Sequence, residues 1–285
     1  MKTILAIIND PENSGYFVQY AALLAKDLEM NVHLLYVEDP DYYITATLGA
    51  TGTESVQMQR NLQQVTENAT RILEQRIKDV INEIPAQTTI NYSSEIGITR
   101  LIIEQYLADR GISLVLLESH QNENFWTPDS SSTEIIRHTD CPVWIVPYKA
   151  NYEPIKVIVY ATDYNEEDIP TLTTIIEMTG RHSPEITMLH ITDTDDFKDK
   201  IEQTGFIEMI KSKSEYDKIS VKSIINEKKD NISEIVNDYA SIVHANLVVL
   251  LKENRNFIER IFNPDSTKKI IKKLQTPVLV FHKIK

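Results

Sequence analysis

The chain repeats one part of itself about half its length further on. The stretch TPDSSSTEIIRHTDCPVWIVPYK runs from Thr127 to Lys149, and NPDSTKKIIKKLQTPVLVFHK runs from Asn263 to Lys283. Both pass from Pro-Asp-Ser through an amphipathic segment to a proline and then to an apolar run. A repeat of this kind indicates that the chain folds into more than one similar unit, so the other segments should repeat in the same order.

Other segments repeat in the same order. Residues 1–10 match residues 154–163, residues 31–39 match 185–193, and residues 112–118 match 245–252. The chain is therefore interpreted as a tandem duplication, with one domain over residues 1–149 and the other over residues 150–285. Polar residues from Tyr148 to Glu153 form the expected linker, and each half of the 285 residues is long enough to bury its own core.

Within each half, apolar and amphipathic segments alternate. Near-continuous apolar runs are typical of strands buried on both faces of a parallel sheet. Amphipathic patterns predict helices over Ser14–Leu28, Gln57–Ile84, Thr99–Asp109 and Ser233–Val243. This alternation predicts two α/β domains, each a doubly wound three-layer fold.

The last strand of each half is followed by no further helix. These strands, VWIVPYK and VLVFHK, are predicted to lie at sheet edges, where their backbone groups need a partner. The two edges can cover each other, which predicts an intramolecular pseudo-dimer and leaves a further homodimer open.

Composition excludes several classes of partner. Acidic residues number 42 and basic residues 29, and the formal charge of -13 argues against binding nucleic acid or an anionic membrane surface. No apolar run suits a signal peptide or a membrane span, and the single cysteine, Cys141, excludes an internal disulfide. A soluble, cytoplasmic protein is expected, with Cys141 as a packed thiol rather than a nucleophile.

Several of these segments together resemble a known family. The apolar runs that end in aspartate, the Arg137-His138-Thr139-Asp140-Cys141-Pro142-Val143-Trp144-Ile145-Val146 ending and the Pro277-Val278-Leu279-Val280 strand are similar to universal stress protein domains. The resemblance covers nearly the whole chain, twice. It implies adenine nucleotide α-hydrolase-like (Rossmann-like) domains with five-stranded parallel sheets in the order 3-2-1-4-5, and a ligand crevice at the carboxyl ends of the first and fourth strands.

The resemblance also implies where an ATP-binding relative would hold its ligand. In this chain Asp10 and Asp163 stand at the adenine-side position, and Val37 and Ile191 stand where the second strand flanks the base. Ser130 and Ser266 follow the aspartates that replace the later Gly-Ser of the family.

The glycine loop that cradles phosphates in the family is missing from both halves. The loop after the fourth strand reads Glu118-Ser119-His120-Gln121-Asn122-Glu123-Asn124 in the first half and Lys252-Glu253-Asn254-Arg255-Asn256 in the second. Only a backbone without side chains lets consecutive N–H groups close on a triphosphate. The carboxylates of the first half predict a crevice closed to ATP. In the second half, the binding of a nucleotide or another anionic metabolite stays open because of Lys252, Arg255 and Ser266.

Structural roles compete with these functional ones. Asp10 and Asp163 can cap the following helices instead of touching a ligand, and Ser130 and Ser266 can be N-cap residues. His120 is expected to be a loop histidine rather than a base or a zinc ligand. No catalytic set and no metal cluster has recognisable spacing. The segment Asp39–Val56 can be a flap over the crevice, a partner contact or a disordered excursion.

The sequence thus predicts a stress-response protein that is not an enzyme, has no required cofactor, and acts by binding a protein partner or a small ligand. The alternative is a nucleotide-dependent switch that uses only the second crevice, with Asp163, Lys252, Arg255 and Ser266 around the ligand.

Overall fold

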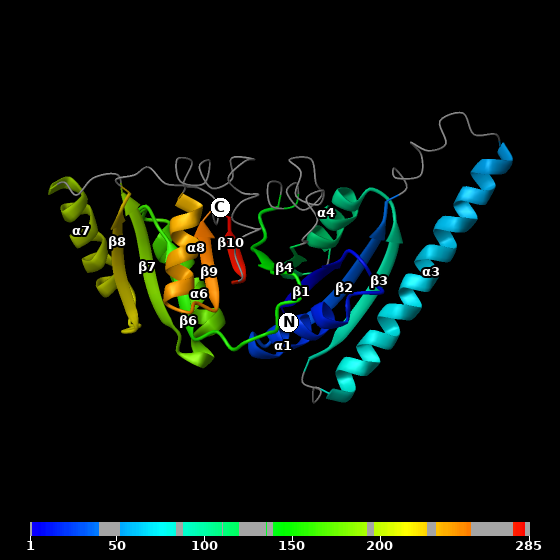
Figure 1. Ribbon diagram of the computed structural model, residues 1–285, viewed down its shortest axis with the longest axis horizontal. Coiled ribbons are helices and arrows are strands. Elements are labelled where there is room, and N and C mark those ends of the chain that lie inside the picture. The colour runs from blue at the N-terminus through cyan, green and yellow to red at the C-terminus, as the bar shows by residue number, and fades with distance from the viewer. Residues whose placement is uncertain are drawn as a thin grey trace. The chain divides into compact units, whose positions relative to one another are not determined.

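A computed structural model describes residues 2–39, 52–83, 88–109, 111–119, 135, 139–192, 197–226, 232–251 and 276–282 of the chain. These residues form two compact units. The first unit holds strands β1 to β4, and the second holds strands β5 to β10 (Figure 1).

The first unit is a parallel sheet with helices between its strands. Its strands have the order β3-β2-β1-β4, and every neighbouring pair is parallel. The strands are β1 (Thr3–Ile8), β2 (Asn31–Glu38), β3 (Ile90–Ile96) and β4 (Ile112–Glu118). The helices are α1 (Gly15–Asp27), α3 (Gly52–Glu83) and α4 (Thr99–Asp109).

The second unit repeats this order. Strands β8-β7-β6-β9-β10 follow one another in parallel, which is the order 3-2-1-4-5 that the resemblance implied. The strands are β5 (Val143–Val146), β6 (Val157–Ala161), β7 (Glu185–Thr192), β8 (Ile219–Ile225), β9 (Leu247–Leu251) and β10 (Val278–Phe281). The helices are α6 (Asp168–Thr179), α7 (Phe197–Lys213) and α8 (Ile232–Ile242), with a 3-10 turn over Gly180–His182.

The predicted α/β class and the doubly wound order are therefore confirmed. One strand lies outside its own repeat, since β5 comes from the first half of the sequence but pairs antiparallel with β10 inside the second unit. Both final strands thus have a hydrogen-bonded neighbour on this side, as strand edges require. The predicted division of the chain at residues 149 and 150 follows the sequence repeat and stays a prediction.

The cores form from the runs that the sequence marked as apolar. In β1, the residues from Ile4 to Ile8 are all buried, and β9 is buried along its whole length. Helix α1 buries Phe17, Ala21, Leu24 and Ala25, which lie on one stripe because they are three or four residues apart.

The third strand of each unit was not identified from the sequence. Strands β3 and β8 read INYSSEI and ISVKSII, and most of their residues are half-buried or exposed. Such edge strands carry no continuous apolar run, so the pattern that revealed the central strands is absent from them.

Helix α3 begins earlier than predicted. It starts at Gly52 instead of Gln57, so the last part of the predicted Asp39–Val56 loop is helical; residues 40–51 lie outside the described residues. Figure 1 shows α3 lying along β3 and extending past the end of that strand. Glycine and threonine at positions 52 and 53 weakened the helical pattern, because both are poor helix formers.

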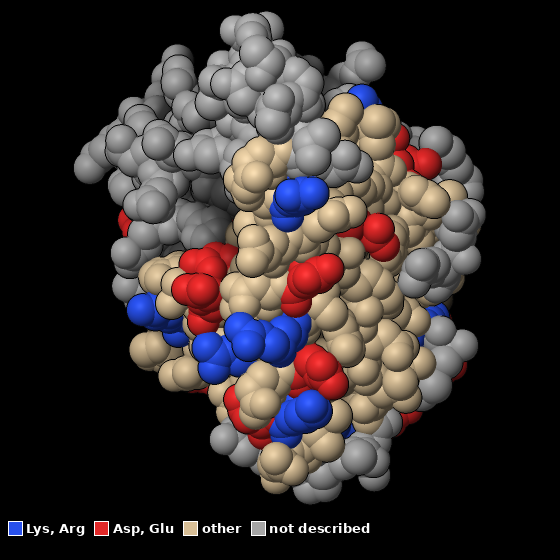
Figure 2. Space-filling view, turned by 90° about the vertical axis from the view of Figure 1, so that its right-hand side faces the viewer, with Lys and Arg blue, Asp and Glu red and all other residues tan. Residues whose placement is uncertain are grey.

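The surface beside α3 carries both signs of charge. Figure 2 shows lysine and arginine side chains interspersed with aspartate and glutamate, and the described part of this face has no large basic patch. Lys78 and Glu74 on α3, for example, form an exposed ion pair of 3.2 Å. Among the described residues, no helix is long and apolar enough to cross a membrane.

Candidate functional site

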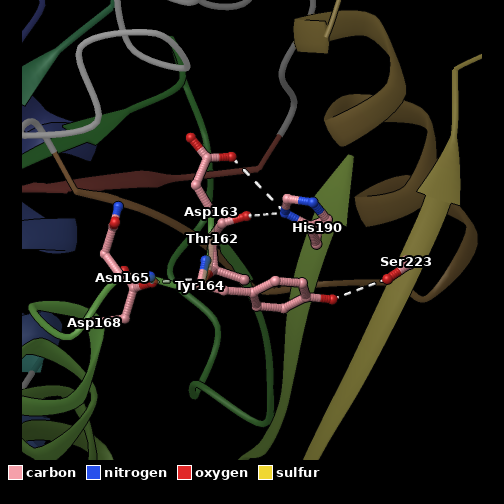
Figure 3. A network of polar contacts seen from close by, with 7 residues as sticks. All are labelled: Thr162, Asp163, Tyr164, Asn165, Asp168, His190 and Ser223. Carbon is pink, nitrogen blue, oxygen red and sulfur yellow. Dashed lines mark hydrogen bonds and ion pairs between the residues drawn. The ribbon is translucent and has the colours of Figure 1, made fainter. Parts of the chain in front are cut away.

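The clearest candidate site lies at the carboxyl end of β6 in the second unit. In an open parallel sheet, ligands bind outside the carboxyl ends of the strands, at the point where the strand order reverses. Strand β6 is that point here, since it pairs with β7 on one side and β9 on the other. The loop after β6 brings Thr162, Asp163, Tyr164 and Asn165 to this edge (Figure 3).

A buried carboxylate holds this loop. Asp168, the first residue of α6, is fully buried and accepts hydrogen bonds from the hydroxyls of Tyr160, at 2.7 Å, and Thr162. It also accepts the backbone N–H of Asn165 at 3.0 Å. Burial raises the pKa of Asp168, and the three donors oppose that rise. Thr162 and Asn165, at the two ends of the loop, are thus both hydrogen-bonded to the buried Asp168.

Tyr164 lies between these two anchors. Its backbone has a φ of 60°, the left-handed conformation that disfavours residues with a Cβ atom. Its backbone N–H donates to Thr162 Oγ1 at 2.9 Å. Its ring stacks on the ring of His190, with centroids 4.2 Å apart and an angle of 27° between the planes.

Two further contacts fix the Tyr164 ring. Phe206 of α7 packs against it with a centroid distance of 4.9 Å. Its hydroxyl lies 2.9 Å from the Ser223 hydroxyl on β8, as Figure 3 shows. The ring therefore covers the carboxyl ends of β7 and β8.

The hydrogen bonds of His190 define which ring nitrogen carries the proton. Nδ1 lies 2.9 Å from the Thr162 carbonyl oxygen, which can only accept, so Nδ1 is the donor. The neutral ring then has its lone pair on Nε2. Asp163 Oδ1 is 3.8 Å from the same Nδ1, an ion pair only when the ring is protonated.

In the first unit the equivalent loop is held differently. Asp10 accepts the backbone N–H of Glu12 at 3.0 Å and of Asn13 at 3.4 Å, and the Asn13 side-chain amide at 2.7 Å. These groups belong to the loop, and α1 begins only at Gly15. Asp10 thus accepts hydrogen bonds from the backbone of its own loop, which is a structural role. It does not cap α1 itself, because its partners precede Gly15.

A buried glutamate ends the neighbouring strand of the first unit. Glu118 is the last residue of β4 and is 5% exposed, and its Oε1 has no hydrogen-bond partner among the described residues. Burial, followed by the charge of Asp10, raises the pKa of Glu118 from 4.5 to about 7. Two carboxyl groups therefore lie near each other at the carboxyl ends of β1 and β4, the switch point of this unit.

The structure describes half of the predicted site residues. Asp10 is exposed, Val37 and Asp163 are half-buried, and Ile191 is 8% exposed. Asp10 and Val37 lie at the carboxyl ends of β1 and β2, and Asp163 and Ile191 lie at those of β6 and β7. Ser130, Lys252, Arg255 and Ser266 lie outside the described residues, as does His120.

Sequence analysis missed the three residues that organise the second site. None of His190, Tyr164 and Asp168 was predicted to belong to a binding site. A signal was present for Asp168, because a second aspartate five residues after Asp163 falls at the start of the helix, where acidic residues are favoured. The pairing of Tyr164 with His190, 26 positions apart, has no local signal.

Metal binding finds no support in the described part of the chain, where no group of three or more His, Cys, Asp or Glu side chains could hold an ion. Cys141 is half-buried, and burial raises the pKa of its thiol to about 12. A thiol with such a pKa is almost entirely protonated at neutral pH, so it is a poor nucleophile.

Comparisons with known proteins agree with this fold. The model of the Universal stress protein family matches residues 1–147 and again residues 154–282. A search of curated proteins found no match.

Similar solved structures cover almost the whole chain. A universal stress protein from Archaeoglobus fulgidus DSM 4304 has 13% sequence identity and a TM-score of 0.66, over 99% of this chain and 98% of that chain. A functionally unknown protein from Pseudomonas aeruginosa PAO1 has 16% identity and a TM-score of 0.61, over 99% and 93%. The cytoplasmic domain of a prokaryotic cation chloride cotransporter has 12% identity and a TM-score of 0.56, over 98% and 94%. At these identities the likeness shows the fold alone.

Proposed function

The chain belongs to the universal stress protein family as a tandem member, and we propose that it is a cytosolic stress-response protein that binds a partner or a small ligand and does not hydrolyse ATP. This proposal is supported above all by Glu118. A carboxyl group, 5% exposed, takes the position that must be an open backbone in a triphosphate cradle.

The charge of Glu118 acts in the same direction as its bulk. When Glu118 is ionised, its charge and one phosphate charge at about 5 Å repel each other by roughly 3 kcal/mol at an effective dielectric constant of about 20. Because the pKa of Glu118 is about 7, protonation near neutral pH relieves this repulsion, so the charge term is largest above that pH. Asp10 adds a second negative charge at the same end of the sheet. A ligand without phosphates meets neither of these repulsive terms.

The test is calorimetric titration of the full chain with Mg-ATP, together with a phosphate-release assay. We expect no binding tighter than about 1 mM, which corresponds to about -4 kcal/mol, and no release above the buffer rate. Micromolar binding or steady turnover by the wild-type chain would refute the proposal. Glu118→Gly removes both the side chain and its charge, and we expect it to bind Mg-ATP at least tenfold more tightly than the wild type does.

The nucleotide-switch alternative concerns the second unit. It is supported by Asp163, whose side chain is 27% exposed at the carboxyl end of β6, where a ligand could reach it. The same titration tests this alternative. If the wild-type chain binds a nucleotide, Arg255→Glu should abolish that affinity, and an unchanged affinity would exclude the second crevice as the site.

A further inference from the structure

The Tyr164 ring occupies a place in the second unit where the neighbouring side chains form a stacking surface for a planar ring. One face of the ring lies on His190, Phe206 packs at an angle of 44°, and Ser223 meets the hydroxyl. These neighbours come from β7, α7 and β8. The place is therefore formed by the main elements of the unit, while its occupant comes from the loop after β6 (Figure 3).

The backbone of Tyr164 opposes this arrangement. A φ of 60° is unfavourable for tyrosine, and glycine or asparagine would adopt it more readily. Strained residues persist where the surrounding contacts outweigh the strain. The conformation alone does not mark a site, because Glu29, Lys149, Ser183 and His244 also have a positive φ. The ring contacts supply that compensation here, so the closed position of Tyr164 depends on them.

The anchors on either side allow the ring to leave without unfolding the loop. Thr162 and Asn165 are tied to the buried Asp168, and none of these bonds involves the Tyr164 side chain. Only Asp163 and Tyr164 lie between the anchored residues. Rotation of the Tyr164 side chain, with the backbone N–H of this residue still bonded to Thr162 Oγ1, would expose the faces of His190 and Phe206.

The polar groups around the place indicate the chemistry of a ligand. His190 donates through Nδ1 to the Thr162 carbonyl, which leaves Nε2 as an acceptor with no partner among the described residues. The Ser223 hydroxyl can donate or accept. A planar ring that carries a hydroxyl or amino group satisfies both the stacking surface and these groups.

We propose that His190, Phe206 and Ser223 form a binding slot for a small planar ligand with a hydroxyl or amino group, and that Tyr164 fills this slot until such a ligand displaces it. This rests on the proposed role in binding a small ligand and adds where and what the second unit binds. Because the ligand must displace the ring, its apparent affinity is lowered by the fraction of chains in which the slot is closed.

The experiment uses the full chain and 4-methylphenol, which reproduces the tyrosine side chain, as the probe. Binding is followed by ligand-observed NMR and by the shift in melting temperature. We expect Tyr164→Gly, which removes the ring and suits the left-handed backbone, to bind the probe at least tenfold more tightly than the wild type. Tyr164→Phe keeps the ring but loses its hydroxyl contact with Ser223, so its affinity for the probe should lie between those of the wild type and Tyr164→Gly.

A matched control removes a tyrosine from elsewhere in the same unit. Tyr216 donates its hydroxyl to the Pro184 carbonyl and is likewise half-buried, so Tyr216→Gly creates a comparable vacancy outside the slot. A Tyr164→Gly chain that is folded by circular dichroism and binds the probe no better than Tyr216→Gly would overturn the proposal.

A measurement on the wild type covers the case in which Tyr164→Gly does not fold. With ring-labelled tyrosine, saturating 4-methylphenol should move the Tyr164 resonance from its stacked position to that of a solvent-exposed ring. A Tyr164 signal that does not move would contradict the slot. Mg-ATP binding or turnover by the wild type would refute the proposed function, but it would leave the result with the planar probe standing.

Discussion

Glu118 makes the stability of the chain depend on pH in a direction opposite to that of most surface carboxylates. The pKa of this residue is about 7 in the folded chain against an ordinary 4.5, because burial and the nearby Asp10 disfavour its charged form. Glu118→Gln keeps the size of the side chain and cannot ionise. The variant therefore isolates the free-energy cost of the charge.

The sign follows from which state binds the proton. Below about pH 4.5 the glutamate is protonated in both states, and the wild type and Glu118→Gln should be similarly stable. Between about pH 4.5 and about pH 7 the unfolded chain loses its proton first, so the wild type loses stability as the pH rises. At about pH 8 the loss reaches its full value of about 3 kcal/mol, and Glu118→Gln should be the more stable chain by that amount.

Urea unfolding, followed by far-ultraviolet circular dichroism at three pH values across this window, measures the difference. Glu104→Gln is the matched control, because Glu104 lies on α4 of the same unit and is 44% exposed in its pair with Arg100. This control should change stability by less than about 1 kcal/mol at any pH. A stability difference between the wild type and Glu118→Gln that stays constant across the window would refute the reasoning, whatever its size.

Three further outcomes follow from the contacts of the second unit and from Cys141. Asp168→Asn puts an amide where three donors converge and should destabilise the chain by roughly 2–4 kcal/mol in thermal unfolding; a loss under about 0.5 kcal/mol would show that the loop is not anchored there. Tyr164→Phe and Ser223→Ala should each cost about 1 kcal/mol, and the double variant should cost no more than one of them; additive losses would contradict the hydroxyl contact. Cys141 should react with iodoacetamide at neutral pH far more slowly than a free thiol, by a factor of about 100 or more, and alkylation at the rate of a model thiol would contradict its raised pKa.

The sequence allowed the central strands to be predicted, but not the edge strands. Strands such as β1 and β9 are buried on both faces, so nearly every residue is apolar and the run is visible without an alignment. The strands β3 and β8 are partly exposed, and they mix polar and apolar residues without a continuous apolar run or regular alternation along their length. The start of α3 at Gly52 shows the complementary case, in which a helix continues through residues that disfavour it locally.

The candidate site was predictable only where it depends on position along the chain. Asp10 and Asp163 follow central strands, so their place at the carboxyl edge of a sheet could be predicted from the strand pattern. The stack of Tyr164 on His190 could not, because it depends on a left-handed residue in the loop and on how β6 and β7 lie side by side. The role of Glu118 was half predictable. Its charge was evident from the sequence, but its unpartnered Oε1 and raised pKa follow from burial.

The two crevices have in common that each holds a residue at a cost to the fold. Ionised Glu118 costs the first unit about 3 kcal/mol, and the left-handed backbone of Tyr164 costs the second about 1 kcal/mol. Glutamine at the one position and glycine at the other would avoid these costs while preserving the strands around them. At Tyr164, glycine would also lose the ring contacts with His190 and Phe206, so only the replacement at Glu118 is expected to be a net gain in stability. At Glu118 the cost is therefore a direct test of the proposed function, because a residue kept for ligand binding need not be the most stable choice for its position, whereas a residue kept for packing should be.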